Sequence, residues 1–160
     1  MPRTTVPEGS ADPGRLRQAA IALLARRDYA STALQSALEA RGHDRDGVAA
    51  LIATLRSERL VDDDRYAANY VAYHAERGQG PVRISSALRA VGLPETTIGP
   101  ALASVTDWRA RAARQRARKF GRSLPTSWAE RARQARFLQY RGFSSDDIRS
   151  VLGTDIDPET

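Results

Sequence analysis

Apolar residues along the chain recur in three tracts that lie fifty residues apart. In each tract a leucine stands four residues before a glycine, and apolar residues stand six and ten residues after it. This spacing predicts a short helix that ends at the glycine, which easily adopts the left-handed conformation, followed by a second amphipathic helix. The positions are Leu38, Val48 and Ile52 around Gly42; Leu88, Ile98 and Leu102 around Gly92; and Leu138, Ile148 and Leu152 around Gly142.

A further helical run precedes each of these pairs, at residues 14–27, 63–77 and about 107–120. The repeating unit is therefore three helices, present three times. No segment alternates apolar and polar residues with enrichment in β-branched side chains, so strands are not expected. We predict an all-α fold of three tandem three-helix repeats, with a period of about 50 residues, that form an elongated, curved array.

The repeats divide the chain into five segments. Both ends of the chain are polar and lack periodicity, so we expect them to be disordered. The predicted segments are a disordered N-terminal tail (1–11), repeat 1 (12–60), repeat 2 (61–106), a basic repeat 3 (107–153) and an acidic disordered tail (154–160).

Five polar residues stand where helices should begin: Asp12, Ser31, Asp44, Ser127 and Ser144. Each is expected to cap its helix, because a short polar side chain accepts a hydrogen bond from a free backbone N–H of the first turn. The last two are followed three residues later by an acidic residue, which is the spacing of a capping box.

Pro100 conflicts with the pattern, because it falls inside the predicted sixth helix. Proline lacks a backbone donor and clashes with the preceding turn. Either the helix begins late, near Thr96 or Thr97, with Pro100 still in its first turn, or it is kinked.

Three consecutive aspartates, Asp62 to Asp64, stand at the start of the fourth helical run. They favour capping and the positive end of the helix dipole. A metal or catalytic site is the alternative, but consecutive side chains at a helix start diverge, whereas metal ligands converge.

Tyr66, Tyr70 and Tyr73 follow at i, i+4 and i+7 and so share one helical face. A stripe of this kind is typical of a core, and we expect it to be buried. A second interpretation remains for Tyr73, whose hydroxyl at a groove edge would serve a partner. His74 has no second ionisable group that the sequence places beside it, so we expect a packed or surface residue rather than a base.

Composition excludes several kinds of site. The chain has no cysteine and two histidines, which excludes disulfides, thiolate metal sites, cysteine nucleophiles and a histidine-rich metal site. Neither end carries a secretory signal, and no stretch approaches the roughly 20 apolar residues that span a bilayer. We expect a soluble, cytoplasmic monomer that needs no cofactor.

The positive charge is concentrated in one segment. Residues 1–108 hold 13 arginines and 13 acidic residues, whereas residues 109–149 hold 12 basic residues and three acidic ones. Such a segment attracts polyanions or acidic protein surfaces, although it is also typical of a solvated arginine-rich helix. The basic candidates for binding a partner or DNA are Arg109, Arg111, Arg114, Arg116, Arg118, Lys119 and Arg122, then Arg131, Arg133, Arg136 and Arg141.

Four of these, at positions 111, 114, 118 and 122, have the spacing i, i+3, i+7 and i+11. They are therefore expected to make one face of the seventh helix strongly positive.

Residues 60–84 carry the most specific motif of the chain. Leu60-Val-Asp-Asp-x-Arg-Tyr-Ala67, followed by Gly78-x-Gly-Pro-x-Arg-Ile84, resembles the central signature of the RecX family, regulators of the RecA recombinase. The resemblance extends over about residues 15–153. The chain departs from the family at Ala33 and Ala37, where a glutamate and a basic residue are usual. The glycines and the proline of the signature are interpreted as a joint that ends one helix and starts the next.

The resemblance implies a non-enzymatic regulator, mainly an inhibitor. Such a protein binds in the groove of the RecA–DNA filament and restrains ATP hydrolysis, strand exchange and filament extension. The implied partners are the RecA nucleoprotein filament and, weakly or through it, single- or double-stranded DNA. We expect Arg65 and Arg83 of the signature either to face that groove or to pair with nearby acidic residues, namely the aspartates at 62–64 or Glu76.

Two other classes of function compete with this interpretation. A stand-alone DNA-binding protein would use the helix pairs like helix-turn-helix units, and the charge permits it. However, no predicted helix combines arginine with Asn or Gln in an arrangement that reads bases. An enzyme would need a nucleotide loop, a nucleophile paired with a base, or metal-ligand spacing, and the sequence shows none of these.

Overall fold

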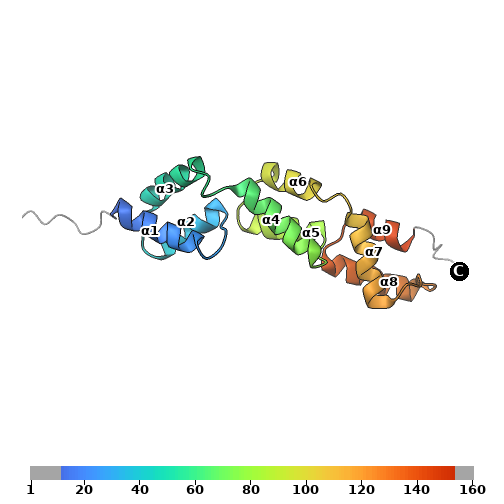
Figure 1. The fold of residues 1–160 in the computed structure, drawn as a ribbon. Helices are drawn as coiled ribbons and strands as arrows, with labels where there is room; N and C mark the ends of the chain where they lie inside the picture. The colour runs from blue at the N-terminus through green and yellow to red at the C-terminus, as the bar shows by residue number, and fades with distance from the viewer. Residues whose placement is uncertain (1–11, 154–160) are drawn as a thin grey trace, which may run out of the picture. The chain divides into compact units, whose positions relative to one another are not determined.

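A computed structural model describes residues 12–153, which contain helices and no strand (Figure 1). The predicted all-α fold is confirmed, whereas the two predicted disordered tails lie outside the described residues. The helices are α1 (Pro13–Leu24), α2 (Ser31–Ala40), α3 (Arg45–Ser57), α4 (Asp63–Glu76), α5 (Pro81–Ala90), α6 (Glu95–Ala103), α7 (Trp108–Phe120), α8 (Trp128–Arg141) and α9 (Ser145–Leu152).

These helices form three successive modules: α1–α3, α4–α6 and α7–α9. The chain folds into two compact units that divide between Tyr66 and Ala67, inside α4. The elongated, curved array and the residue boundaries of the repeats stay predictions.

The three repeated glycine positions have the same local structure. Gly42, Gly92 and Gly142 have φ angles of +89°, +88° and +95°, the left-handed region in which glycine is unstrained. The leucine four residues before each glycine is fully buried. Val48 and Ile98 are also fully buried, but Ile148 is only half-buried.

The first module has a compact apolar core. α1, α2 and α3 and the turn after α3 contribute to it. Burying large aliphatic side chains in this way stabilises each by about 1.5–3 kcal/mol. The core consists of Leu16, Ala20, Leu23, Tyr29, Leu34, Leu38, Val48, Ile52, Leu55 and Val61.

Four of the five predicted helix caps are confirmed. The side chains of Asp12, Asp44, Ser127 and Ser144 each accept a hydrogen bond from a backbone N–H of the first turn. The prediction for Ser31 is wrong.

Ser31 is the first residue of α2, and Ala30 occupies the cap position without a side-chain acceptor. The acceptor comes from Asp63 at the start of α4. Its carboxylate takes hydrogen bonds from the Ser31 backbone N–H at 2.7 Å and from the Ser31 hydroxyl at 2.6 Å. A residue 32 positions away therefore caps α2.

α6 begins at Glu95 and contains Pro100 as its sixth residue. The prediction of a later start, which would have placed Pro100 in the first turn, is wrong. The helix continues past the proline, because the Ser104 N–H donates to the Pro100 carbonyl at 3.1 Å.

The joint at residues 78–81 has a second role in the second unit. It ends α4 and starts α5, and it also contacts the end of α8. The Gly80 N–H donates to the Arg141 carbonyl and the Val82 N–H donates to the Gly142 carbonyl, both at 2.8 Å. A Cβ added at Gly80 would overlap the Gly142 backbone, so this contact requires glycine.

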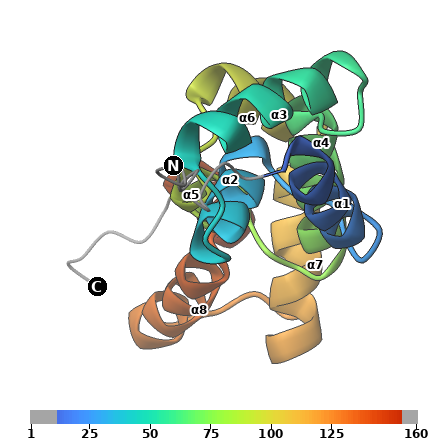
Figure 2. The same ribbon diagram turned by 90° about the vertical axis from the view of Figure 1, so that its left-hand side faces the viewer.

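The third module has a smaller apolar core, formed by Ala112, Leu138 and Phe143. Partly buried aromatic and aliphatic residues pack against it, among them Trp108 and Phe137. α7 and α8 are joined by the loop 121–127, which is drawn in orange in Figure 2.

Candidate partner-binding surface

Two of the three aspartates at 62–64 cap helices. Asp62 accepts a hydrogen bond from the Arg65 backbone N–H at 3.0 Å, so it caps α4 as predicted, and Asp63 caps α2. In residues 12–153, no group of three or more His, Cys, Asp or Glu side chains is placed to hold a metal ion. Within the same range, none of the helices is both long and apolar enough to cross a bilayer.

His74 lies on α4 against two tyrosine rings. Its ring centroid is 4.1 Å from that of Tyr70 and 5.1 Å from that of Tyr73. Burial lowers the pKa of His74, and the positive charges of Arg77 and Arg83 lower it further, which favours the neutral imidazole.

The tyrosines of α4 do not form a buried stripe, in contrast to the prediction. The fully packed face of α4 consists of Ala67, Val71 and Ala75. Tyr73 is 53% exposed, with the Arg77 guanidinium 3.4 Å from its ring centroid.

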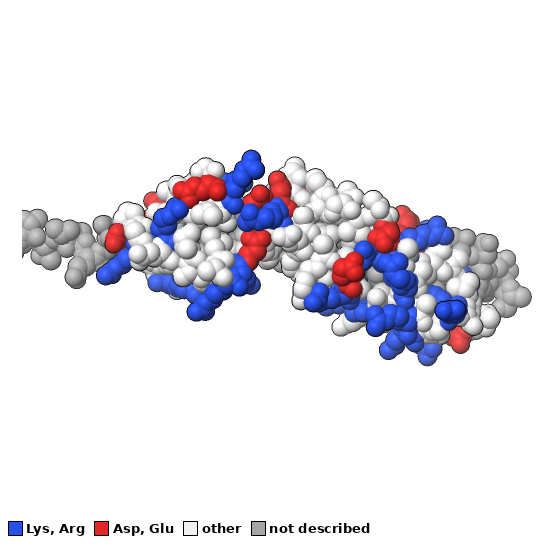
Figure 3. All heavy atoms as spheres, in the orientation of Figure 1, with Lys and Arg blue, Asp and Glu red and all other residues white. Residues whose placement is uncertain are grey.

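Cations predominate on the surface over α7 and α8, whereas Arg and acidic residues are interspersed over the first module (Figure 3). In the first unit, Arg17 pairs with Glu58 at 2.7 Å and Arg65 lies 3.5 Å from Asp28. The Arg65 guanidinium also donates to the carbonyls of Arg59 and Leu60. These contacts hold the turn between α3 and α4.

The start of α7 is less positive than predicted. Arg111 pairs with Asp107 at 2.7 Å and with Glu76 at 3.0 Å, and Arg114 lies 3.4 Å from Asp107. The hydrogen bond from Arg111 lowers the pKa of Asp107. Since α7 ends at Phe120, Arg122 lies beyond the helix. The predicted four-residue stripe is therefore wrong at Arg122 and also at Arg111, whose charge is paired with two acidic residues.

Arg116 is a structural residue rather than a surface contact, which corrects its place among the binding candidates. Its side chain is buried, with 5% of the residue exposed. The guanidinium donates to Gln134 Oε1 at 3.3 Å and to the carbonyls of Ser123 and Arg122 at 3.1 and 3.2 Å. It thereby ties α7 to α8 and to the loop between them.

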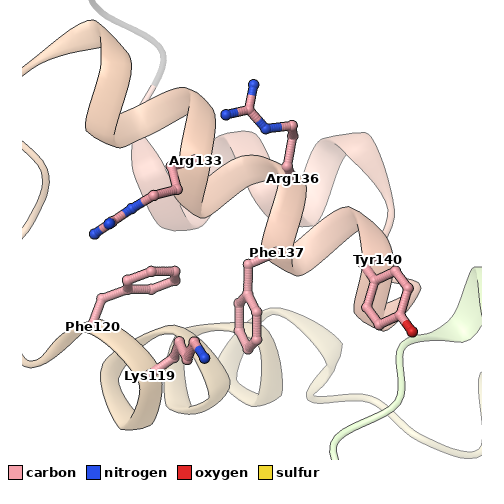
Figure 4. Close-up of a pocket in the computed structure, with 6 residues that line it drawn as sticks. All are labelled: Lys119, Phe120, Arg133, Arg136, Phe137 and Tyr140. Atoms are coloured by element: carbon pink, nitrogen blue, oxygen red, sulfur yellow. The ribbon is translucent and has the colours of Figure 1, made fainter.

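A groove lies between α7 and α8, with a volume of about 510 Å³. We call it the basic-aromatic groove (Figure 4). Arg133 is directed toward Phe120, Tyr140 stands at one end, and Arg136 extends away from the rings. The lining residues are Lys119, Phe120, Arg133, Arg136, Phe137 and Tyr140.

The three cations of this groove lie over aromatic rings or extend into solvent rather than pairing with acids. Within the described residues, no carboxylate lies at ion-pair distance from any of them. The Arg133 guanidinium lies 5.3 Å from the Phe120 ring centroid, and Lys119 Nζ lies 5.9 Å from that of Phe137. Their charge is therefore available to an anionic partner.

The other predicted residues occupy different surroundings. Arg109 and Arg118 are exposed on α7. Arg131 donates to the Gly153 carbonyl at 2.8 Å, and Arg141 donates to Gln115 at 3.0 Å. Arg83 lies over the Tyr140 ring at 5.6 Å, rather than beside an acid.

Sequence reasoning missed the aromatic part of the groove. Arg133 and Arg136 are followed by Phe137 and Tyr140 at i, i+3, i+4 and i+7 along α8. That spacing can be read from the sequence. The packing of Phe120 from α7 against these residues cannot, because it depends on how the two helices pack.

Tandem three-helix modules define a helical-repeat protein, and in this chain the third module has a cation-rich, aromatic surface. The model of the third three-helix domain of RecX matches residues 107–152, and that of the second matches residues 62–102. The chain is 41% identical over 145 residues to the "Regulatory protein RecX" of Halorhodospira halophila, which covers 90% of both chains. It is 38% identical over 141 residues to that of Pseudomonas savastanoi pv. phaseolicola, covering 88% of this chain and 91% of the relative. The chain belongs to the RecX family.

The crystal structure of RecX from Lactobacillus salivarius has the same fold, with a TM-score of 0.75 at 21% identity. The structural match covers 87% of this chain and 93% of the Lactobacillus salivarius chain. The relatives in this family are named regulatory proteins, which fits a binding role rather than an enzymatic one.

Proposed function

We propose that this protein regulates the RecA recombinase by binding in the groove of the RecA–DNA filament. Bound there, it restrains ATP hydrolysis, strand exchange and filament extension. Membership in the RecX family carries the proposal, because 41% identity over 90% of both chains unites this protein with a named regulatory relative.

The proposed mechanism requires binding alone. A regulator that contacts neighbouring RecA protomers holds them in one arrangement and so opposes the changes that accompany hydrolysis. The free cations of α7 and α8 would approach filament-bound DNA or acidic protein surface.

Contacts within the protein support some binding candidates more than others. The cations of the basic-aromatic groove, with exposed Arg109 and Arg118, are available to the filament. Arg116 and Arg65 are committed to contacts within the protein. Substituting either of these two would test folding rather than binding.

The test is a titration of the protein into RecA filaments on single-stranded DNA with ATP, at physiological salt, following ADP release. We expect hydrolysis to fall when the protein is substoichiometric to RecA. No effect, together with tight and sequence-specific DNA binding in the absence of RecA, would favour the stand-alone DNA-binding alternative.

A charge-reversal pair identifies the surface. Arg114→Glu with Arg118→Glu changes one exposed face of α7 and should weaken the inhibition. Arg45→Glu with Arg56→Glu on α3 makes the same change in net charge and should leave more of it intact. Equal inhibition by both double variants would show that this face of α7 does not contact the filament.

A further inference from the structure

We propose that the acidic segment 154–160 of this chain binds in the basic-aromatic groove of its own third module. The carboxylates of the segment pair there with the cations that line the groove. Since any other anion must first displace the segment, this autoinhibitory contact weakens the binding of a partner to the groove. The contact itself is independent of the proposed function, whereas its effect on inhibition rests on that function.

Charge complementarity is the first argument. The segment 154–160, which lies outside the described residues, has the sequence Thr-Asp-Ile-Asp-Pro-Glu-Thr, with three acidic residues and no basic one. The six residues that line the groove include three cations and no acid. Other arginines of the third module already have acidic partners, among them Arg111 and Arg149. The groove therefore offers the segment cations for which no acid of the third module competes.

The point where the segment begins is the second argument. Gly153 follows α9 directly, and its carbonyl accepts a hydrogen bond from Arg131 of α8 at 2.8 Å. A Cβ built on Gly153 would lie 3.6 Å from the same guanidinium. The residue that precedes the segment is therefore held against the helix that supplies Arg133 and Arg136 to the groove.

The segment is long enough to cross α8. Arg131 and Arg133 are two residues apart, so they lie on nearly opposite sides of the helix. Half the circumference of a helix about 10–12 Å across is about 17 Å. Seven residues span at most about 24 Å. A path over the exposed side of α8 therefore reaches Arg136 first and Arg133 next.

The spacing of the acids fits that path. Asp155, Asp157 and Glu159 stand at every second position, so in an extended segment their carboxylates share one side. Such carboxylates are about 7 Å apart along the chain. That interval is close to the roughly 5–6 Å between the Cβ atoms of residues at i and i+3 on a helix, the spacing of Arg133 and Arg136.

A second copy of the chain could supply the same acids, but the tether favours a contact within one chain. A short linker keeps its two ends at an effective concentration in the millimolar range. Another copy at micromolar concentration therefore competes poorly for the groove.

The test of the contact uses the chain of 160 residues without RecA and without nucleic acid. Because the chain has no cysteine, Thr160→Cys creates a single site for a nitroxide spin label next to the acids. We expect the label to broaden the backbone amide NMR signals of Arg133 and Arg136 at low salt, and to leave those of α3 unchanged. The broadening should disappear at about 1 M salt, where the Debye length is about 3 Å.

Neutralising the acids separates charge pairing from mere proximity. Asp155→Asn with Asp157→Asn should restore the intensity of the groove signals. Asp46→Asn with Asp64→Asn makes the same change in net charge at exposed positions of α3 and α4, and should leave the broadening intact.

The effect on regulation is measured in the titration of RecA filaments. Asp155→Asn with Asp157→Asn should halve hydrolysis at a concentration about fivefold lower than the wild-type protein, as expected for the loss of two exposed ion pairs. Asp46→Asn with Asp64→Asn should shift that concentration less.

Equal broadening in α3 and α8, or broadening that survives in Asp155→Asn with Asp157→Asn, would overturn the contact. Broadening that requires mixing spin-labelled chains with isotope-labelled ones would assign the contact to a second copy and overturn the intrachain proposal. Confirmed broadening with an unchanged half-inhibitory concentration would overturn the autoinhibition. If no variant inhibits RecA, the proposed function fails, but the NMR result stands because RecA is absent from that measurement.

Discussion

Gly42 and Gly142 end the second helices of the first and third modules with almost the same backbone, at φ +89° and +95°. Their surroundings differ. Apart from Gly42 and its two chain neighbours, no atom lies within 4 Å of the point where a side chain would begin on Gly42, whereas Arg83 of α5 fills that space at Gly142. The end of the second helix is therefore exposed in the first module. In the third module the corresponding helix end contacts α5 of the second module.

The apolar core of the first module is also larger than that of the third. The first module buries ten residues in one apolar cluster, and the third buries three, supplemented by the polar contact between Arg116 and Gln134. The third module therefore depends more on hydrogen bonds and on its neighbour. It leaves large aromatic residues exposed on its surface, among them Trp128 and Tyr140.

The largest expected effect comes from Gly142→Ala. The new methyl group meets Arg83, and the left-handed backbone disfavours alanine, so we expect a loss of stability on the order of 3 kcal/mol or more. Gly42→Ala meets only the backbone penalty of about 1–2 kcal/mol.

Urea unfolding measures both changes. Circular dichroism reports all helices, and tryptophan fluorescence reports the third module, because both tryptophans, Trp108 and Trp128, lie there. Equal losses in the two variants would show that the contact between α5 and the end of α8 adds no stability.

Arg116→Met should have the next largest effect. It removes the donors to Gln134 and to the loop carbonyls of Arg122 and Ser123, and buried acceptors left unsatisfied cost about 1–3 kcal/mol. Arg118→Met, an exposed change on the same helix, should stay within about 0.5 kcal/mol of the wild-type protein. A small effect of both in fluorescence-monitored unfolding would mean that the polar contact does not supplement the core.

Asp63→Ala tests a polar contact in the first module. It removes the cap of α2 and should cost about 1–2 kcal/mol, measured by thermal unfolding with circular dichroism. Asp64→Ala at an exposed neighbouring position is the control. A first module that is held by its apolar core alone would show no difference between them.

The smallest effect is a pH dependence in the third module. The hydrogen bond from Arg111 lowers the pKa of Asp107 in the folded protein. A lowered folded pKa contributes stability above the unfolded pKa, and this is lost as the pH falls through the folded pKa. Asp107→Asn should therefore lose less stability than the wild-type protein between neutral and acidic pH. Identical losses in fluorescence-monitored unfolding would show that this pair is screened by solvent.

The sequence predicted the local structure well because local structure follows from local pattern. The glycines at 42, 92 and 142 and the leucines before them lie where the repeat placed them. What it missed joins distant residues: Asp63 with Ser31, and Gly80 with Arg141. Neither pairing produces a periodic signal, because each depends on how separate helices pack.

Arg116 shows a related limit for the binding surface. In the sequence it is one of many arginines in α7, and only the packing against α8 distinguishes it from exposed Arg118. Charge counting located the basic segment but could not separate internal guanidinium groups from external ones.

The cap that Asp63 provides has a consequence for synthesis on the ribosome. The α2 helix leaves the exit tunnel before residues 61–63. The N–H group of Ser31 therefore lacks its carboxylate acceptor until Asp63 has emerged. Val61, 1% exposed in the core of the first module, arrives equally late. The nascent first module therefore becomes complete only when the opening residues of α4 emerge, and a fragment that stops at residue 60 would lack both.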